Sequence, residues 1–290
     1  MTSLDQWPGD EARVVVEGRA LSATILPERG GKIISIRDAR GVEWMSPPGA
    51  EVGRPARPGD DFLRAEMAGW DECAPTIVAC TVGRIPLADH GELWTKPFVV
   101  DGTALHVDDD TLGYRFMRAI EPTDDGLTFR YSATAWDRDV PFLWAAHPQF
   151  AAPEGTRVLL PPSARHVVDV MDPVLPVLPW SPELASIDTV ERGEYRKLYV
   201  DASENASSAT LLRSDNSALR LTWSRECRYL GLWFDNAAFR SEPIIAIEPS
   251  TAYFDSLATA MDNRRYAMIP AHRTLEWSLT LTATGENDDY

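Results

Sequence analysis

The sequence has few features of a membrane, secreted or metal-binding protein. No apolar run among its 290 residues approaches the roughly 20 that a membrane-spanning helix needs. The first residues show no basic start followed by an apolar segment, so we expect a cytoplasmic protein. Only three cysteines are present, Cys73, Cys80 and Cys227, and no CxxC spacing occurs. This argues against both a disulfide framework and a structural zinc site, and predicts ordinary buried or half-buried thiols.

Basic residues are also scarce. The chain has 28 Lys and Arg against 44 Asp and Glu, which gives a formal net charge of −16. Because nucleic-acid binding needs a basic surface, this charge argues against a nucleic-acid partner and favours a small or neutral ligand. A serine hydrolase is disfavoured, since no GxSxG motif occurs.

Alternation of apolar and polar residues with a period of two is abundant. Over residues 275–282, Leu275, Trp277, Leu279 and Leu281 alternate with polar residues, and residues 127–135 show the same pattern. This alternation is typical of strands with one buried face. Further short β-rich runs occupy residues 12–18, 20–28, 31–38, 113–120, 156–161, 209–214, 218–224 and 229–235.

Helix signals are few by comparison. Only residues 251–263 are typical of a short helix, with Ser250 or Thr251 available as N-cap. Because strands do not alternate with long helices, a parallel doubly wound sheet is not indicated, and we predict an all-β sandwich or barrel. No linker divides the chain, so we expect a single domain over residues 1–290, with its core at about 13–283 and an acidic tail after it. The proline-rich stretches 45–61 and 173–183 should be loops that rim a cleft.

Two ionisable residues stand in apolar surroundings. His147 ends the apolar run 142–146, which by itself favours a satisfied core histidine. Glu248 follows four apolar residues, and Pro249 restricts it to extended geometry. A buried carboxylate is costly unless it is paired or takes part in chemistry. On facing strands, a protonated His147 and an ionised Glu248 would form a complementary acid and base.

A third candidate is His90. The preceding Asp89 can orient its ring, and the following Gly91 permits a sharp bend.

Four segments, taken in order, carry a resemblance to a known family. They are LPERGGKIISI (26–36), DHGELW (89–94), AAHPQF (145–150) and AIEPSTAYFD (246–255). With them the chain resembles the galactose mutarotase-like (aldose 1-epimerase) superfamily over about residues 13–283. The resemblance implies a β-supersandwich of two large antiparallel sheets with a sugar-binding cleft. It also implies an isomerase that interconverts the anomers of a free aldose without metal or organic cofactor.

The same resemblance implies roles for individual residues. Glu248 would be the base that takes the proton of the anomeric hydroxyl, and His147 would protonate the ring oxygen. His90 would hydrogen-bond the sugar. Asp71 is our candidate for a carboxylate that contacts the sugar hydroxyls, with Arg64 nearby. The alternative is that Asp71 and its neighbour Glu72 are loop charges that face water.

Aromatic side chains are candidates for a wall against the flat C–H faces of a pyranose. These candidates are Trp70, Trp94, Trp144 and Trp233. Two positions depart from the family pattern. Trp94 occupies a place where many relatives have arginine, which disfavours a sugar phosphate, and Gln149 stands where tyrosine is commoner and would alter contacts in the cleft.

Two other functions remain open at this point. A protein on the same fold could bind a sugar without converting it. A glycoside hydrolase would need two carboxylates, and Glu248 with Asp71 or Glu92 could supply them.

Overall fold

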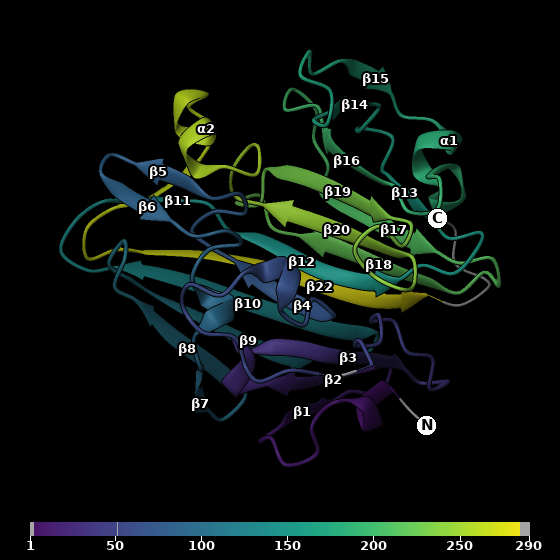
Figure 1. Ribbon diagram of the computed structural model, residues 1–290, viewed down its shortest axis with the longest axis horizontal. Helices are drawn as coiled ribbons and strands as arrows, with labels where there is room; N and C mark the ends of the chain where they lie inside the picture. Colours follow the sequence, from purple (N-terminus) through teal and green to yellow (C-terminus); the bar gives the residue numbers. More distant parts are fainter. Residues whose placement is uncertain (1–2, 51, 285–290) are drawn as a thin grey trace.

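Two large antiparallel sheets dominate the computed structural model, which describes residues 3–50 and 52–284 (Figure 1). The first sheet has ten strands, in the order β1 (Val14–Glu17), β2 (Leu21–Leu26), β3 (Lys32–Asp38), β4 (Gly69–Cys73), β12 (Ala145–Ala151), β20 (Ile244–Ser250), β19 (Tyr229–Asp235), β16 (Tyr195–Val200), β14 (His166–Asp169) and β15 (Val177–Pro179). The second has eight, in the order β13 (Arg157–Leu159), β17 (Ser208–Leu212), β18 (Ala218–Trp223), β22 (Thr274–Thr284), β10 (Gly126–Ala135), β9 (Tyr114–Pro122), β8 (Ala104–Asp109) and β7 (Val99–Asp101). The predicted all-β fold of two large antiparallel sheets is confirmed.

The two clearest sequence patterns become neighbouring strands of the second sheet. β10 and β22 pair so that Phe129 lies opposite Leu279 and Tyr131 lies opposite Trp277. Since directly paired residues point to the same face, the apolar sets of both strands enter the core together.

The core is built from the inward faces of both sheets. In the largest cluster of buried apolar side chains, Phe150 and Ile247 of the first sheet meet Phe129 and Leu279 of the second. Trp70 of β4 stacks on Phe129, with ring centroids 4.9 Å apart. The opposite faces of β4, β12 and β20, which are adjacent strands, are therefore free to form a site (Figure 1).

Smaller elements lie at the ends of the sheets. Two pairs of strands form small two-stranded sheets: the hairpin of β5 (Cys80–Val82) with β6 (Ile85–Leu87), and β11 (Val140–Phe142) with the distant β21 (Ala267–Ile269). The α-helices are α1 (Pro182–Ala185) and α2 (Leu257–Asp262), and single 3₁₀ turns occupy Ser3–Gln6, Pro27–Arg29, Phe62–Arg64, Leu93–Thr95 and Ile187–Thr189. Within the described ranges, none of the helices has the length and apolar character to cross a membrane.

The predicted helix over 251–263 begins later than expected. Ser250 and its neighbour Pro249 still belong to β20, where they pair with Tyr229 and Leu230. Ser250 is held in a strand, and the Thr251 hydroxyl accepts a hydrogen bond from the Trp144 amide at 2.8 Å. The predicted caps Ser250 and Thr251 were therefore wrong. Ser256 is the N-cap instead, and its hydroxyl accepts a hydrogen bond from the Thr259 amide at 3.3 Å.

The long-loop predictions were partly right. Described residues of the stretch 45–61 are irregular. The stretch 173–183 is not loop throughout, because it contains β15 and the start of α1. The predicted thiols are confirmed, with Cys73 and Cys227 buried and Cys80 half-buried. The predicted acidic tail, residues 285–290, lies outside the described residues.

One ion pair joins the two sheets inside the core. Arg118 of β9 and Glu72 of β4 are both fully buried, and Arg118 Nη1 lies 2.7 Å from Glu72 Oε1. Tyr131 and Trp144 Nε1 also donate to Glu72, at 3.3 and 2.8 Å. Arg118 Nη2 donates a short hydrogen bond to the carbonyl of Gly31. Arg118 thereby ties the second sheet to two segments of the first.

Removal of either partner of this pair should strongly destabilise the protein. In Arg118→Met or Glu72→Gln one buried charge loses its counter-ion, which typically costs about 3–5 kcal/mol. Arg115 lies on the same strand and pairs with Asp108 at an exposed site, so Arg115→Met should cost less than about 1 kcal/mol. Urea unfolding of the variants measures both free energies, and equal effects at the two sites would contradict the structural role of Arg118.

Candidate functional site

A row of polar side chains crosses the first sheet on the face turned away from the core. His147 of β12 pairs directly with Asp71 of β4. The pairing of Ala145 with Ser250 places Glu248, two residues earlier on β20, opposite His147. Gly231 of β19 then pairs with Glu248 on one side and with Tyr199 of β16 on the other. We call this set, together with Lys32 of β3, the cleft row: Lys32, Asp71, His147, Glu248, Gly231 and Tyr199.

The acid and base candidates face one another in the middle of the cleft row. His147 Nε2 lies 3.8 Å from Glu248 Oε1, and the side chains are 8% and 0% exposed. The other oxygen of Glu248 accepts a short hydrogen bond from Lys197 Nζ. Lys197 also lies 3.3 Å from Asp255 Oδ1. The buried carboxylate is therefore paired, and one of its oxygens remains directed toward His147.

Burial opposes the protonated state that we expected for His147. Burial lowers the pKa of His147 well below its ordinary value, and electrostatic interactions with His90, Lys197 and Lys32 lower it further. Burial raises the pKa of Glu248, whereas the Lys197 ammonium opposes that shift. The sequence pattern suggested mutual stabilisation of two charges, but desolvation outweighs that attraction at His147.

A second buried ion pair occupies the other end of the cleft row. Lys32 Nζ donates a short hydrogen bond to Asp71 Oδ2 and another, at 3.0 Å, to the carbonyl of Ala68. Burial raises the pKa of Asp71, and Lys32 opposes that shift. Asp71 is 1% exposed, so the alternative that Asp71 and Glu72 are loop charges facing water was wrong. Both lie on β4, and strand alternation directs Asp71 to the cleft and Glu72 to the core.

Several buried polar atoms of this site have no hydrogen-bond partner within residues 3–50 and 52–284. They are Asp71 Oδ1, His147 Nδ1, Glu248 Oε1, and both Oε1 and Nε2 of Gln149. Buried polar groups are almost always hydrogen-bonded in native proteins, because desolvation without a partner is costly. A ligand rich in hydroxyl groups, which both donate and accept, would satisfy this mixed set.

His90 approaches the cleft row from a loop. Its Nδ1 lies 2.9 Å from Asp89 Oδ2, as predicted from the sequence. Its ring stacks on Phe62 with centroids 3.6 Å apart and an interplanar angle of 7°. The centroids of the His90 and His147 rings are 5.4 Å apart. Gly91 has φ +73°, and a Cβ there would lie 2.0 Å from the Ala74 carbonyl oxygen, so the bend requires glycine.

A small cavity of about 140 Å³ lies over these residues. We call it the site pocket; its walls include His90, His147, Gln149, Lys197, Trp233 and Asp255. This volume is below the roughly 300–1,000 Å³ of pockets for drug-sized ligands, so the site pocket suits one small ring.

Of the predicted aromatic wall, only Trp233 lines the site pocket. Trp70 and Trp144 point into the core, since Trp70 stacks on Phe129 and Trp144 donates to Glu72. Trp94 is 4% exposed and donates to the carbonyl of Gly91 at 3.1 Å. Its ring packs edge-on against Phe62, on which the His90 ring stacks. Trp94 therefore supports His90 from behind and does not itself line the site pocket. Predictions of direct sugar contact by Trp70, Trp94 and Trp144 are therefore corrected.

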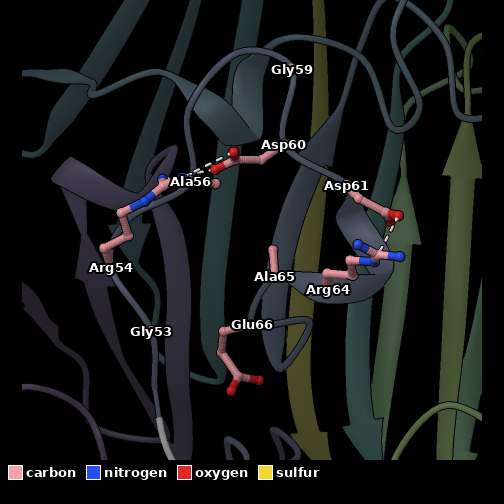
Figure 2. A pocket seen from close by; sticks show the side chains of 9 residues that line it. All are labelled: Gly53, Arg54, Ala56, Gly59, Asp60, Asp61, Arg64, Ala65 and Glu66. Carbon is pink, nitrogen blue, oxygen red and sulfur yellow. Dashed lines mark hydrogen bonds and ion pairs between the residues drawn. The ribbon is translucent and has the colours of Figure 1, made fainter.

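Arg64 is not brought to the site either. Its side chain is 88% exposed and turns toward Asp61, 3.6 Å away (Figure 2). It lines a separate cavity of about 580 Å³ in the segment 53–66, which shares no residue with the site pocket. Glu92, one of the carboxylates considered for glycoside hydrolysis, is absent from the lining of the site pocket as well.

The sequence analysis missed both lysines of the site. Lys197 and Lys32 stand in apolar strands, which was the available signal, because a lysine on a buried strand needs an acidic partner. It also missed Asp255, whose Oδ1 accepts a hydrogen bond of 2.5 Å from the Tyr199 hydroxyl. No sequence spacing connects these residues, since strand order alone brings them together.

Solved structures with the same fold are numerous, although sequence comparison is uninformative. No family model matches the chain, and no curated protein matches it. The Slr1438 protein of Synechocystis superposes with a TM-score of 0.76 at 14% identity, covering 96% of this chain and 98% of the other. A galactose mutarotase-like protein of Lactobacillus casei gives 0.69 at 18% identity, with coverage of 94% and 100%.

A third structure is described as a galactose mutarotase related enzyme of Lactobacillus acidophilus. It gives a TM-score of 0.68 at 13% identity and covers 96% of this chain and 99% of the other. At such identities the comparisons establish the fold, which is galactose mutarotase-like, and nothing finer. Within the described part of the chain, no three His, Cys, Asp or Glu side chains are grouped so that they could hold a metal ion.

The lowered pKa of His147 can be tested directly. In NMR titration of ring-labelled histidines, His147 should protonate at a pH well below the ordinary 6.5. Lys197→Met should move this midpoint upward, because it removes a cation that disfavours the imidazolium. Lys197→Arg keeps the positive charge and is the control. A His147 midpoint at or above 6.5 in the wild type would refute this electrostatic description.

Proposed function

We propose that this protein is an aldose 1-epimerase, an isomerase that interconverts the α and β anomers of a free sugar. The observation that carries the proposal is the buried His147 and Glu248 pair, whose Nε2 and Oε1 atoms lie 3.8 Å apart on neighbouring strands. The galactose mutarotase-like fold and the unpartnered polar atoms around the pair support it.

Ring opening follows from the geometry of this pair. Glu248 takes the proton of the anomeric hydroxyl while the bond between C1 and the ring oxygen breaks and C1 becomes a carbonyl. His147 gives a proton to the departing ring oxygen. Concerted transfer avoids both a free oxyanion and a free oxocarbenium ion. Rotation about the C1–C2 bond and closure with the roles reversed yield the other anomer.

The mechanism requires that the pair hold one proton in total. Before opening the proton is on His147, and afterwards it is on Glu248, so the sum does not change. Burial lowers the pKa of His147, so this residue holds the proton weakly. Lys197 adds to this effect, because it disfavours a proton on either partner.

The remaining residues of the site would hold the sugar. His90, Gln149 and Asp71 present polar atoms to its hydroxyls, and Trp233 presents an aromatic face. Gly231 leaves room for this arrangement. A Cβ there would lie 3.1 Å from Glu248 Oε2 and 3.2 Å from the Tyr199 ring.

Replacement of either catalytic residue should abolish anomer exchange. Glu248→Gln keeps the size of the side chain and His147→Asn keeps a polar side chain, but each removes proton transfer and should lower kcat by about a hundredfold or more. The measurement is exchange spectroscopy by NMR, or polarimetry, on freshly dissolved pure anomers of glucose, galactose and other aldoses. Arg64→Ala, at an exposed position outside the site pocket, is the control that should match wild type.

Two results would point to other functions. Sugar binding with no acceleration over buffer would favour a binding protein on this fold. Release of reducing ends from glycosides would favour a hydrolase. Either result would end the epimerase proposal.

The pH dependence should reflect the single proton of the pair. As pH rises the pair loses this proton and kcat/KM falls; at low pH the pair gains a second proton and the base is lost. Lys197 lowers the pKa of both residues, so Lys197→Met should shift both limbs of the profile to higher pH. Lys197→Arg should leave the limbs in place. A shift of only one limb, or in the acidic direction, would contradict the shared-proton mechanism.

A further inference from the structure

We propose that a groove next to the site pocket binds the second and following sugar units of a reducing oligosaccharide, whose reducing end enters the site pocket. This inference rests on the proposed function for the assignment of the reducing end. We call the groove the outer groove. It has a volume of about 820 Å³ and lies between β14, β16 and β19 on one side and the segment 253–265 on the other.

The outer groove is continuous with the site pocket. Val78, Lys197, Trp233 and Asp255 line both cavities. A molecule bound to His147 and Glu248 therefore has an open path past Lys197 and Trp233. Because the site pocket holds only about 140 Å³, any larger ligand must extend along this path.

Aromatic rings form a platform at the junction. Tyr195 and Trp233 stack with centroids 4.7 Å apart and an interplanar angle of 27°. Phe239 adjoins both, at 5.0 Å from Tyr195 and 5.7 Å from Trp233. Tyr195 and Lys197 are two residues apart on β16, so they share the cleft face. Such rings offer flat apolar surfaces to the C–H faces of pyranoses.

The rest of the outer groove combines apolar and charged side chains. Met171 and Leu175 line it and are 47% and 42% exposed, and Val78 is 49% exposed. Exposed apolar side chains gathered around a groove commonly mark a binding surface. Asp201 and Arg265 lie in the same lining. Apolar faces next to charged hydrogen-bonding groups match a carbohydrate, which has C–H faces and hydroxyl edges.

The test compares sugars that share one reducing unit. Maltose, isomaltose, cellobiose, lactose and maltotriose all end in glucose, so free glucose is the matched control; galactose is compared with a galactobiose. We expect at least one linkage to give a kcat/KM for anomer exchange that is about fivefold to tenfold above that of its own reducing sugar. Exchange is measured by NMR, and binding by saturation-transfer difference spectra.

Variants test whether the higher kcat/KM for oligosaccharides comes from the outer groove. Tyr195→Ala should remove most of the oligosaccharide advantage through KM, while Tyr195→Phe, which keeps the ring, should retain it. Met171→Ala is a second probe at an exposed position that folding does not depend on. It should weaken the longer sugar and leave the kcat/KM of the monosaccharide unchanged.

The outcomes separate this inference from the proposed function. If monosaccharides are exchanged and every oligosaccharide is exchanged no faster than its reducing sugar, the outer groove is not a subsite, and the epimerase proposal stands. If nothing is exchanged, yet oligosaccharides bind more tightly than monosaccharides and Tyr195→Ala removes the difference, the subsite stands and the epimerase proposal falls. If Tyr195→Ala weakens mono- and oligosaccharides equally, the proposal of a separate subsite is overturned.

Discussion

The buried guanidinium of Arg118 holds the parts of the site in register. From the second sheet it bonds Glu72 of β4 and the carbonyl of Gly31, immediately before β3. The residues next to those two anchor points, Asp71 and Lys32, turn to the opposite face and pair there across the cleft row. A change in the position of β3 or β4 would break contacts on both faces at once. One interaction in the core thus determines geometry at the surface where a ligand would bind.

Each carboxylate of the cleft row has a lysine as its partner, and this affects the chemistry. Lys32 neutralises Asp71 and Lys197 neutralises Glu248, so neither acid is an unpaired charge in a buried site. The same ammonium groups disfavour a proton on His147. The two lysines therefore stabilise the carboxylates and at the same time oppose protonation of His147. One oxygen of Glu248 and one oxygen of Asp71 are left without a hydrogen-bond partner among the described residues.

The two cavities along the cleft share Val78, Lys197, Trp233 and Asp255, and different parts of the chain complete each of them. Strands β12, β16 and β19 of the first sheet, together with loop residues such as His90 and Asp255, supply the site pocket, whose volume is small. The outer groove adds β14 and the segment before α2, which is possible because β20 continues through Ser250 and α2 begins only at Leu257. The late start of the helix leaves residues 253–255 to line the groove.

The sequence alone determined the strands with strong alternation and the all-β class, because these depend on local period, and it contains no disulfide or zinc pattern. It also indicated the candidates His147 and Glu248, which are ionisable groups at apolar runs, and His90, which stands between Asp89 and Gly91. Only the tertiary structure decided which face each residue occupies. Trp70 and Asp71 are adjacent, yet one enters the core and the other the cleft. The lysine partners of the carboxylates could not be predicted from the sequence either. Lys197 and Glu248 are 51 residues apart, and only the order of the strands brings them together. Burial, which exists only in the folded chain, also lowers the pKa of His147 and so opposes the charge that the sequence suggested.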